Sequence, residues 1–92
     1  GYVQRALELK PDSAPILDSM GWVLYRLGRL QEAIGYLQQA FSKLPDSEIA
    51  AHLGEVLWMN GDRLQAEKIW QDVLKKAPDS KHVLEVMRRL KL

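Results

Sequence analysis

A single stretch decides the fold of this chain, and it reads Met20-Gly21-Trp22-Val23-Leu24-Tyr25-Arg26-Leu27-Gly28-Arg29-Leu30-Gln31-Glu32-Ala33. Apolar residues three and four positions apart run up to Leu27, Gly28 interrupts the pattern, and a second periodic run begins at Leu30. This spacing is typical of amphipathic helices, and a glycine directly after the last periodic residue indicates a helix end. The stretch therefore predicts two helices joined by a short turn.

The same corner returns further along the chain, in the stretch Leu53-Gly54-Glu55-Val56-Leu57-Trp58-Met59-Asn60-Gly61-Asp62-Arg63-Leu64-Gln65-Ala66. A connector also recurs at nearly the same spacing, as Pro11-Asp12-Ser13, Pro45-Asp46-Ser47 and Pro78-Asp79-Ser80. Pro cannot continue a helix, and Asp or Ser caps the helix that follows. We therefore interpret the chain as an internal repeat, and its Asp-Ser pairs as helix caps rather than catalytic groups.

Apolar periodicity predicts six helices and no strand. Their approximate ranges are 2–10, 14–27, 30–43, 47–59, 63–76 and 81–91. The first range is amphipathic from its beginning, and no capping residue precedes it. We therefore expect the chain to be cut from a longer protein.

The composition is that of a folded globular domain, with 47% apolar and 27% charged residues. A net charge of +1 gives no reason to expect binding to nucleic acid or to a membrane surface. No apolar run reaches about 18 residues, so we expect no segment to insert into a membrane. The absence of Cys excludes disulfides, thiolate metal sites and Cys nucleophiles from these 92 residues.

The repeated residues follow two matching patterns. The first is Leu17-x2-Met20-Gly21-x2-Leu24, Ala33-x3-Leu37, Ala40 and Pro45, and the second is Ala50-x2-Leu53-Gly54-x2-Leu57, Ala66-x3-Trp70, Val73 and Pro78. Two helices per unit and a period of about 34 residues resemble the tetratricopeptide repeat family. The chain departs from the family pattern at Leu24 and Leu57, where the family prefers Tyr.

The resemblance implies an all-α fold, a right-handed solenoid of helix-turn-helix units with about six helices. In this interpretation residues 14–45 and 47–78 are two full repeats. Residues 1–10 are the second helix of a truncated repeat, and residues 80–92 form a C-terminal capping helix. One helix pair cannot bury its apolar stripe alone, so neighbouring pairs are expected to stack.

A narrower resemblance concerns residues 18–28 and 49–58, which are similar to the C-terminal repeats of bacterial envelope tetratricopeptide lipoproteins. It implies an adaptor for an envelope protease or cell-wall hydrolase, in the periplasm or at the outer membrane. The cytoplasm stays open as the alternative, because any targeting or lipidation signal would lie upstream of these residues.

In the family that this chain resembles, the first helix of each pair lines a concave groove. Trp, Tyr and Arg most often dominate protein interfaces, and several stand off the apolar stripe here. The predicted protein-binding groove consists of Asp18, Ser19, Trp22, Tyr25, Arg26, His52, Glu55, Trp58, Met59 and Arg88. The alternative for Trp22, Tyr25 and Trp58 is packing against the next helix. Trp70 lies on the core stripe and is predicted to be structural.

No catalytic, cofactor or metal site is predicted. His52 and His82 are the only histidines, and no matching carboxylate or Cys cluster accompanies them. The chain contains no Gly-rich phosphate loop and no recognisable spacing of a catalytic triad. The family's carboxylate clamp of Lys and Asn is also missing, since Asp18, Ser19, Ala51 and His52 stand in that region.

Two functions without catalysis remain. The first is a protein-binding scaffold or adaptor that holds a protein or peptide partner in the groove. The second is a structural cap of a longer solenoid that also self-associates. Tyr2, Val3 and Leu7 would lose their partner helix at the cut, and their exposure would favour a homodimer.

Overall fold

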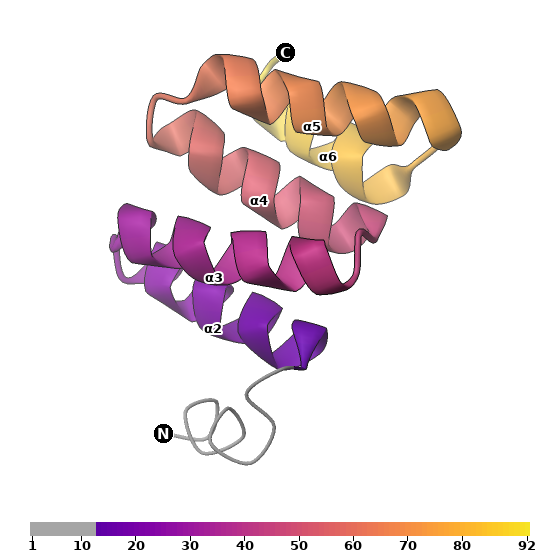
Figure 1. Cartoon of the computed structure of the whole chain (residues 1–92). Helices are drawn as coiled ribbons and strands as arrows, with labels where there is room; N and C mark the ends of the chain where they lie inside the picture. Colours follow the sequence, from indigo (N-terminus) through magenta and orange to yellow (C-terminus); the bar gives the residue numbers. More distant parts are fainter. Residues whose placement is uncertain (1–12) are drawn as a thin grey trace.

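The computed structural model describes residues 13–92, and every regular element in that range is a helix (Figure 1). The helices are α2 (Ala14–Arg26), α3 (Leu30–Lys43), α4 (Ser47–Met59), α5 (Arg63–Lys76) and α6 (Lys81–Arg89). The predicted bounds of α3, α4 and α5 are confirmed. The helix predicted at 2–10, and the exposure predicted there, lie outside the described residues.

Two predicted helix ends are one and two residues too late, because the chain leaves α2 at Arg26 and α6 at Arg89. Arg29 N–H donates to the carbonyl of Leu24, and Leu92 N–H donates to that of Met87, both at 2.9 Å. Such bonds close a helix once the preceding residue turns left-handed. That residue is Gly28 after α2, with φ of 82°, and Lys91 after α6, with φ of 63°.

Two glycines inside the helices allow close helix contacts. A Cβ on Gly21 would lie 2.7 Å from Cγ of Leu37, and one on Gly54 would overlap the indole of Trp70. These contacts explain why the repeat places Gly in the first helix of each pair. α2 packs closely on α3 in this way, and α4 packs closely on α5.

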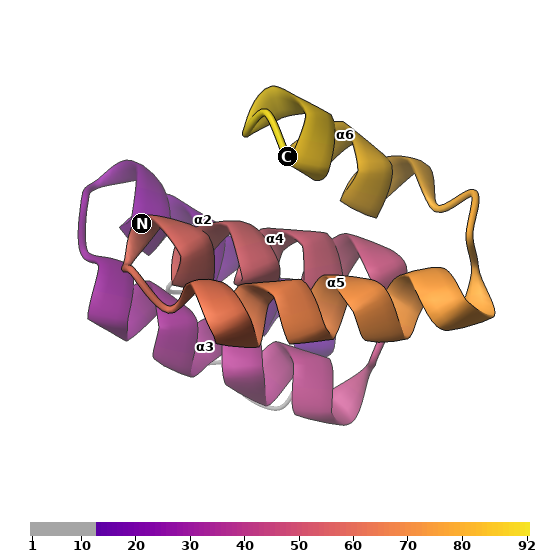
Figure 2. The same ribbon diagram turned by 90° about the horizontal axis from the view of Figure 1, so that it is seen from above.

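α2 to α5 follow one another in chain order, with α4 between α3 and α5 (Figure 1), and α6 lies on the side of α4 that faces away from α3 (Figure 2). The largest fully buried side chain is that of Trp70, as predicted, and Leu37 and Leu57 are buried around the same core. α6 packs mainly on α4 and less on α5. Its side chains Val83 and Val86 complete the core. The last helix is thereby held against the first helix of the preceding repeat.

The predicted caps differ in what their side chains do. Asp46 accepts hydrogen bonds from the backbone N–H groups of Glu48 and Ile49, at 2.7 and 3.1 Å, and so caps α4. Ser13 and Ser80 occupy the N-cap positions of α2 and α6, but their side chains accept no capping hydrogen bond. Asp46 therefore caps its helix through side-chain hydrogen bonds, whereas Ser13 and Ser80 only occupy the capping position. Within residues 13–92, no helix is long and apolar enough to cross a membrane.

Candidate interaction groove

Residues from three helices meet around one small cavity. α2, α4 and α6 are the first helices of successive units, and α4 contacts both of the others. The cavity between them has a volume of about 160 Å³. It is lined by Trp22, Ala51, His52, His82, Glu85, Val86 and Arg89. We call the surface of α2, α4 and α6 around this cavity the inner face.

Two acid–base pairs cross the inner face from one helix to the next. Asp18 Oδ1 on α2 lies 2.8 Å from His52 Nδ1 on α4, and Glu55 on α4 pairs with Arg89 on α6. In both pairs the base follows the acid by 34 residues. Each pair therefore ties the first helix of one unit to the first helix of the next.

Glu55 is the buried centre of a three-helix contact. The carboxylate of Glu55 accepts a hydrogen bond from the Tyr25 hydroxyl at 2.7 Å. The guanidinium of Arg89 donates hydrogen bonds to both carboxylate oxygens, at 2.5 and 3.3 Å. Glu55 is only 2% exposed, so these donors replace the water that a carboxylate otherwise needs. Burial, and then the hydrogen bond to Glu55, raise the pKa of Tyr25 to about 12. The hydrogen bond and charge of Glu55 raise the pKa of Arg89.

His52 lies in a field of carboxylates. Burial lowers its pKa, but the hydrogen bond to Asp18 and the charges of Asp18, Glu48 and Glu55 raise the pKa above its ordinary value. An ionised carboxylate only accepts hydrogen bonds, so Nδ1 of His52 carries the hydrogen that bonds Asp18. The surroundings of this imidazole therefore favour positive charge.

Trp22 forms an aromatic wall of the inner face. Its ring centroid lies 4.4 Å from that of His52 and 5.0 Å from that of Tyr25. The residue keeps part of its surface exposed and lines the cavity. Its counterparts in the next two units are Glu55 and Arg88, so the fold itself does not require Trp at this position.

The remaining residues of the predicted groove have other surroundings. Trp58 packs against Trp70, with ring centroids 5.9 Å apart, and the guanidinium of Arg63 lies 4.7 Å above its ring. Met59 is exposed, and the Ser19 hydroxyl donates to the carbonyl of Pro15 at 2.9 Å.

Arg26 and Arg88 are exposed, and neither lines the cavity on the inner face. Arg88 instead lines a second hollow, with Lys81, Leu84 and Glu85. The structure thus brings together Asp18, Trp22, Tyr25, His52 and Glu55 from the predicted set.

Sequence reasoning missed what α6 contributes. The repeat spacing that relates Trp22 to Glu55 leads on to Arg88, whereas the side chain that binds Glu55 is Arg89. His82, Glu85 and Val86 were also absent from the predicted groove. The sequence did contain one signal for these pairs, because Asp18 and His52 are separated by the same number of residues as Glu55 and Arg89. This equal spacing identifies the pairs only when the positions of the helices are known.

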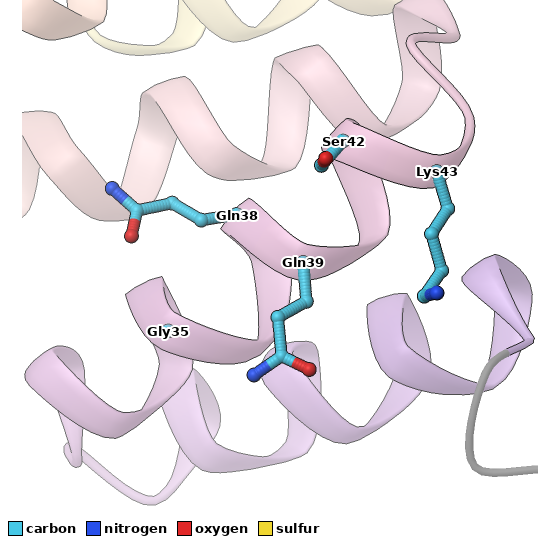
Figure 3. Close-up of a pocket in the computed structure, with 5 residues that line it drawn as sticks. All are labelled: Gly35, Gln38, Gln39, Ser42 and Lys43. Carbon is cyan, nitrogen blue, oxygen red and sulfur yellow. The ribbon is translucent and has the colours of Figure 1, made fainter.

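A wider hollow lies on the outer surface of α3 (Figure 3). Its volume is about 600 Å³, and its lining consists of Gly35, Gln38, Gln39, Ser42 and Lys43. All five residues come from one helix, so the hollow is shallow and joins no two repeats. In the part of the chain that the structure describes, no group of three or more His, Cys, Asp or Glu residues is placed to hold a metal ion.

Helix pairs that repeat at a regular spacing, with small residues at their crossings, define a helical repeat protein. Residues 24–90 match the family described as Tetratricopeptide repeat, and the chain belongs to that family. Repeats of this family are interaction modules that bind proteins and generally lack catalytic activity.

Several relatives share part of the chain. The TPR repeat-containing protein PA4667 of Pseudomonas aeruginosa is 55% identical over 53 residues, which cover 58% of this chain and 9% of that protein. Protein arginine N-methyltransferase 9 of Homo sapiens and of Mus musculus is 46% identical over 46 residues, or 50% of this chain and 5% of that protein. The chain thus matches less than a tenth of the length of each of these relatives.

Proposed function

We propose that this chain is a protein-binding scaffold that holds a partner segment on the inner face. The cavity between α2, α4 and α6 carries the proposal, because it combines the aromatic wall of α2 with polar groups from α4 and α6. Concave sites where several polar groups converge beside an aromatic side chain are common places for ligands to bind. The partner would lie across the first helices and place a side chain beside Trp22.

Trp22 is the residue from which the proposal is best tested. A partly exposed Trp in contact with a partner commonly contributes about 2 kcal/mol or more, which is roughly a 30-fold change in affinity. Peptides selected on the 92-residue chain from a displayed dodecamer library supply the binding partners. We expect Trp22→Ala to weaken their binding by roughly that factor. Val23→Ala is the matched control, because it changes the next residue of α2, which does not line the cavity.

Both variants must first be shown to fold. Helical circular dichroism and the unfolding midpoint are measured first, so that a loss of folding is not mistaken for a loss of binding. If the selected peptides bind the Trp22 variant as tightly as the original chain, the inner face is not where they bind.

A narrower proposal places the partner in a bacterial envelope protease or hydrolase complex, with the chain in the periplasm or at the outer membrane. Its support is the likeness of residues 18–28 and 49–58 to envelope lipoproteins. The test is fractionation of cells that produce the natural full-length protein, with antibodies against this region. Recovery in the cytoplasmic fraction alone would remove this proposal and leave the scaffold function intact.

The second candidate is a structural cap and self-association module of a longer right-handed solenoid. One face of α2 favours it, because Val23 is 42% and Leu27 67% exposed. On α4 the residue equivalent to Val23 is Val56, which is fully buried in the core. The same repeat position is thus buried at Val56 and exposed to solvent at Val23.

The open face of α2 would receive an upstream helix, or a second copy of this chain when that helix is missing. Sedimentation equilibrium over a wide concentration range tests the self-association. We expect Val23→Asp to weaken association, since it charges this face without touching the cavity, and Trp22→Ala to leave it unchanged. A chain that stays monomeric at the highest concentration would count against this candidate.

A further inference from the structure

The cavity on the inner face has the size and lining of a pocket for one long side chain. Ala51 and Val86 are 2% and 5% exposed and form an apolar floor, and Trp22 stands beside them. The volume of about 160 Å³ compares with roughly 150 Å³ for a cavity that holds benzene. The pocket can therefore cover the aliphatic stem of a side chain and leave its end at the polar rim.

The charges around the cavity are unevenly matched. Of the charged residues that line the cavity, Arg89 is positive and Glu85 is negative, while Asp18 and Glu55 bind lining residues without lining it themselves. Lys81 and Arg88 lie beside Glu85 in the adjoining hollow. Arg89 is bound to Glu55, and Asp18 to His52. Glu85 lines the cavity, is exposed, and has no side-chain hydrogen bond or ion pair within residues 13–92.

His52 lines the cavity and is surrounded by carboxylates, of which Asp18 is bonded to it. Although burial lowers the pKa of this imidazole, the surrounding carboxylates raise the pKa above its ordinary value. A group that gains a proton more easily than in water lies where a positive charge is stabilised. The unpaired carboxylate of Glu85 and the acidic surroundings of His52 therefore both favour a cationic ligand.

We propose that the cavity receives a lysine or arginine side chain of the partner, whose cationic end pairs with Glu85. The methylenes would lie over Ala51 and Val86, and the cation would approach the face of Trp22. Long basic side chains commonly bury their stems and keep the charged end at the surface, and cations are attracted to indole rings. This assignment rests on the proposed scaffold function, because it names the residue class that the inner face selects.

The test compares three small probes of one design on the 92-residue chain. They are Nα-acetyl-arginine amide, the uncharged isostere Nα-acetyl-citrulline amide, and Nα-acetyl-glutamate amide. Nuclear magnetic resonance titrations follow the indole signal of Trp22 and the imidazole of His52. We expect the arginine probe to bind about two- to fivefold more tightly than the citrulline probe, which is the range for an exposed ion pair. The glutamate probe should bind more weakly than both.

Two charge-removing variants supply the decisive comparison. Glu85→Gln is expected to bring the arginine probe down to the affinity of the citrulline probe and to leave the citrulline probe unchanged. Glu67→Gln removes the same charge from an exposed position of α5 outside the cavity and should change neither.

The outcomes distinguish this inference from the function on which it rests. Equal binding of the arginine and citrulline probes, preference for glutamate, or no shift at Trp22 and His52 would overturn the basic pocket. In each case the scaffold function stands if Trp22→Ala still weakens the selected peptides. If Trp22→Ala leaves those peptides unaffected, the scaffold function fails as well.

Discussion

Replacement of Arg89 by Ala is expected to loosen α6 and to lower the free energy of unfolding. The guanidinium provides two of the three hydrogen bonds that Glu55 accepts, so the variant leaves a buried carboxylate with Tyr25 as its remaining donor. Removing a partner from a buried charged group costs about 3–5 kcal/mol when the pair is fully buried. Here the Arg89 side chain is 54% exposed, so water screens and replaces part of the interaction, and we expect a loss of about 1–2 kcal/mol.

The neighbouring residue provides the control for this prediction. Arg88 is also an exposed arginine of α6, and its side chain makes no hydrogen bond or ion pair within residues 13–92. Arg88→Ala removes the same charge and a similar length of side chain, and should change the unfolding free energy by less than about 0.5 kcal/mol. The difference between the two variants therefore isolates the contact with Glu55.

Urea unfolding followed by circular dichroism measures the global effect, and amide hydrogen exchange measures the local one. Because α6 packs mainly on α4 and less on α5, we expect exchange in α6 to accelerate more than exchange in α3. A double-mutant cycle with Glu55→Gln should show coupling between the two positions. Equal unfolding free energies for the Arg88 and Arg89 variants would refute the reasoning.

Three further predictions concern glycine and histidine positions. Gly54→Ala should destabilise the chain by about 1–3 kcal/mol, because its Cβ would overlap Trp70, and thermal unfolding will show the loss. Gly35→Ala should instead stabilise it by about 0.5–1 kcal/mol, since nothing lies within 4 Å of the added Cβ in the middle of α3; a lower melting temperature would contradict this. The pKa of His52 is raised on folding, so its contribution to stability is fully present below its unfolded pKa and is lost as pH rises through the folded pKa. The unfolding free energy of the original chain minus that of His52→Gln should therefore increase as pH falls from 8 to 6, and the increase should vanish in an Asp18→Asn background.

The fold was predictable because its determinants are local and repeated. Gly28 ends one helix by its left-handed backbone, and Gly61 does the same in the next unit. Gly54 must be small because Trp70 crosses it, and the spacing of these residues recurs along the chain. Helix bounds follow from such signals because each depends on residues only a few positions away.

The candidate site was less predictable because it depends on how helices of different units cross. Tyr25 and Trp58 occupy equivalent positions, yet one binds Glu55 and the other packs between Trp70 and Arg63. Which of two adjacent arginines of α6 meets Glu55 is decided by the rotation of that helix on α4. The repeat spacing of the sequence carries no information on that rotation.

The two acid–base pairs also make the order of the units matter. The acid always belongs to the earlier helix and the base to the later one, as with Asp18 and His52. A unit copied and inserted behind itself would present Ser19 where His52 now stands, and Val56 where Arg89 now stands. The new junction between the two copies would lack its acid–base pair although every helix kept its shape. The stack is thus built from units that are alike in backbone but not interchangeable, and an engineer who shuffled or duplicated them would need to restore a base on each incoming helix.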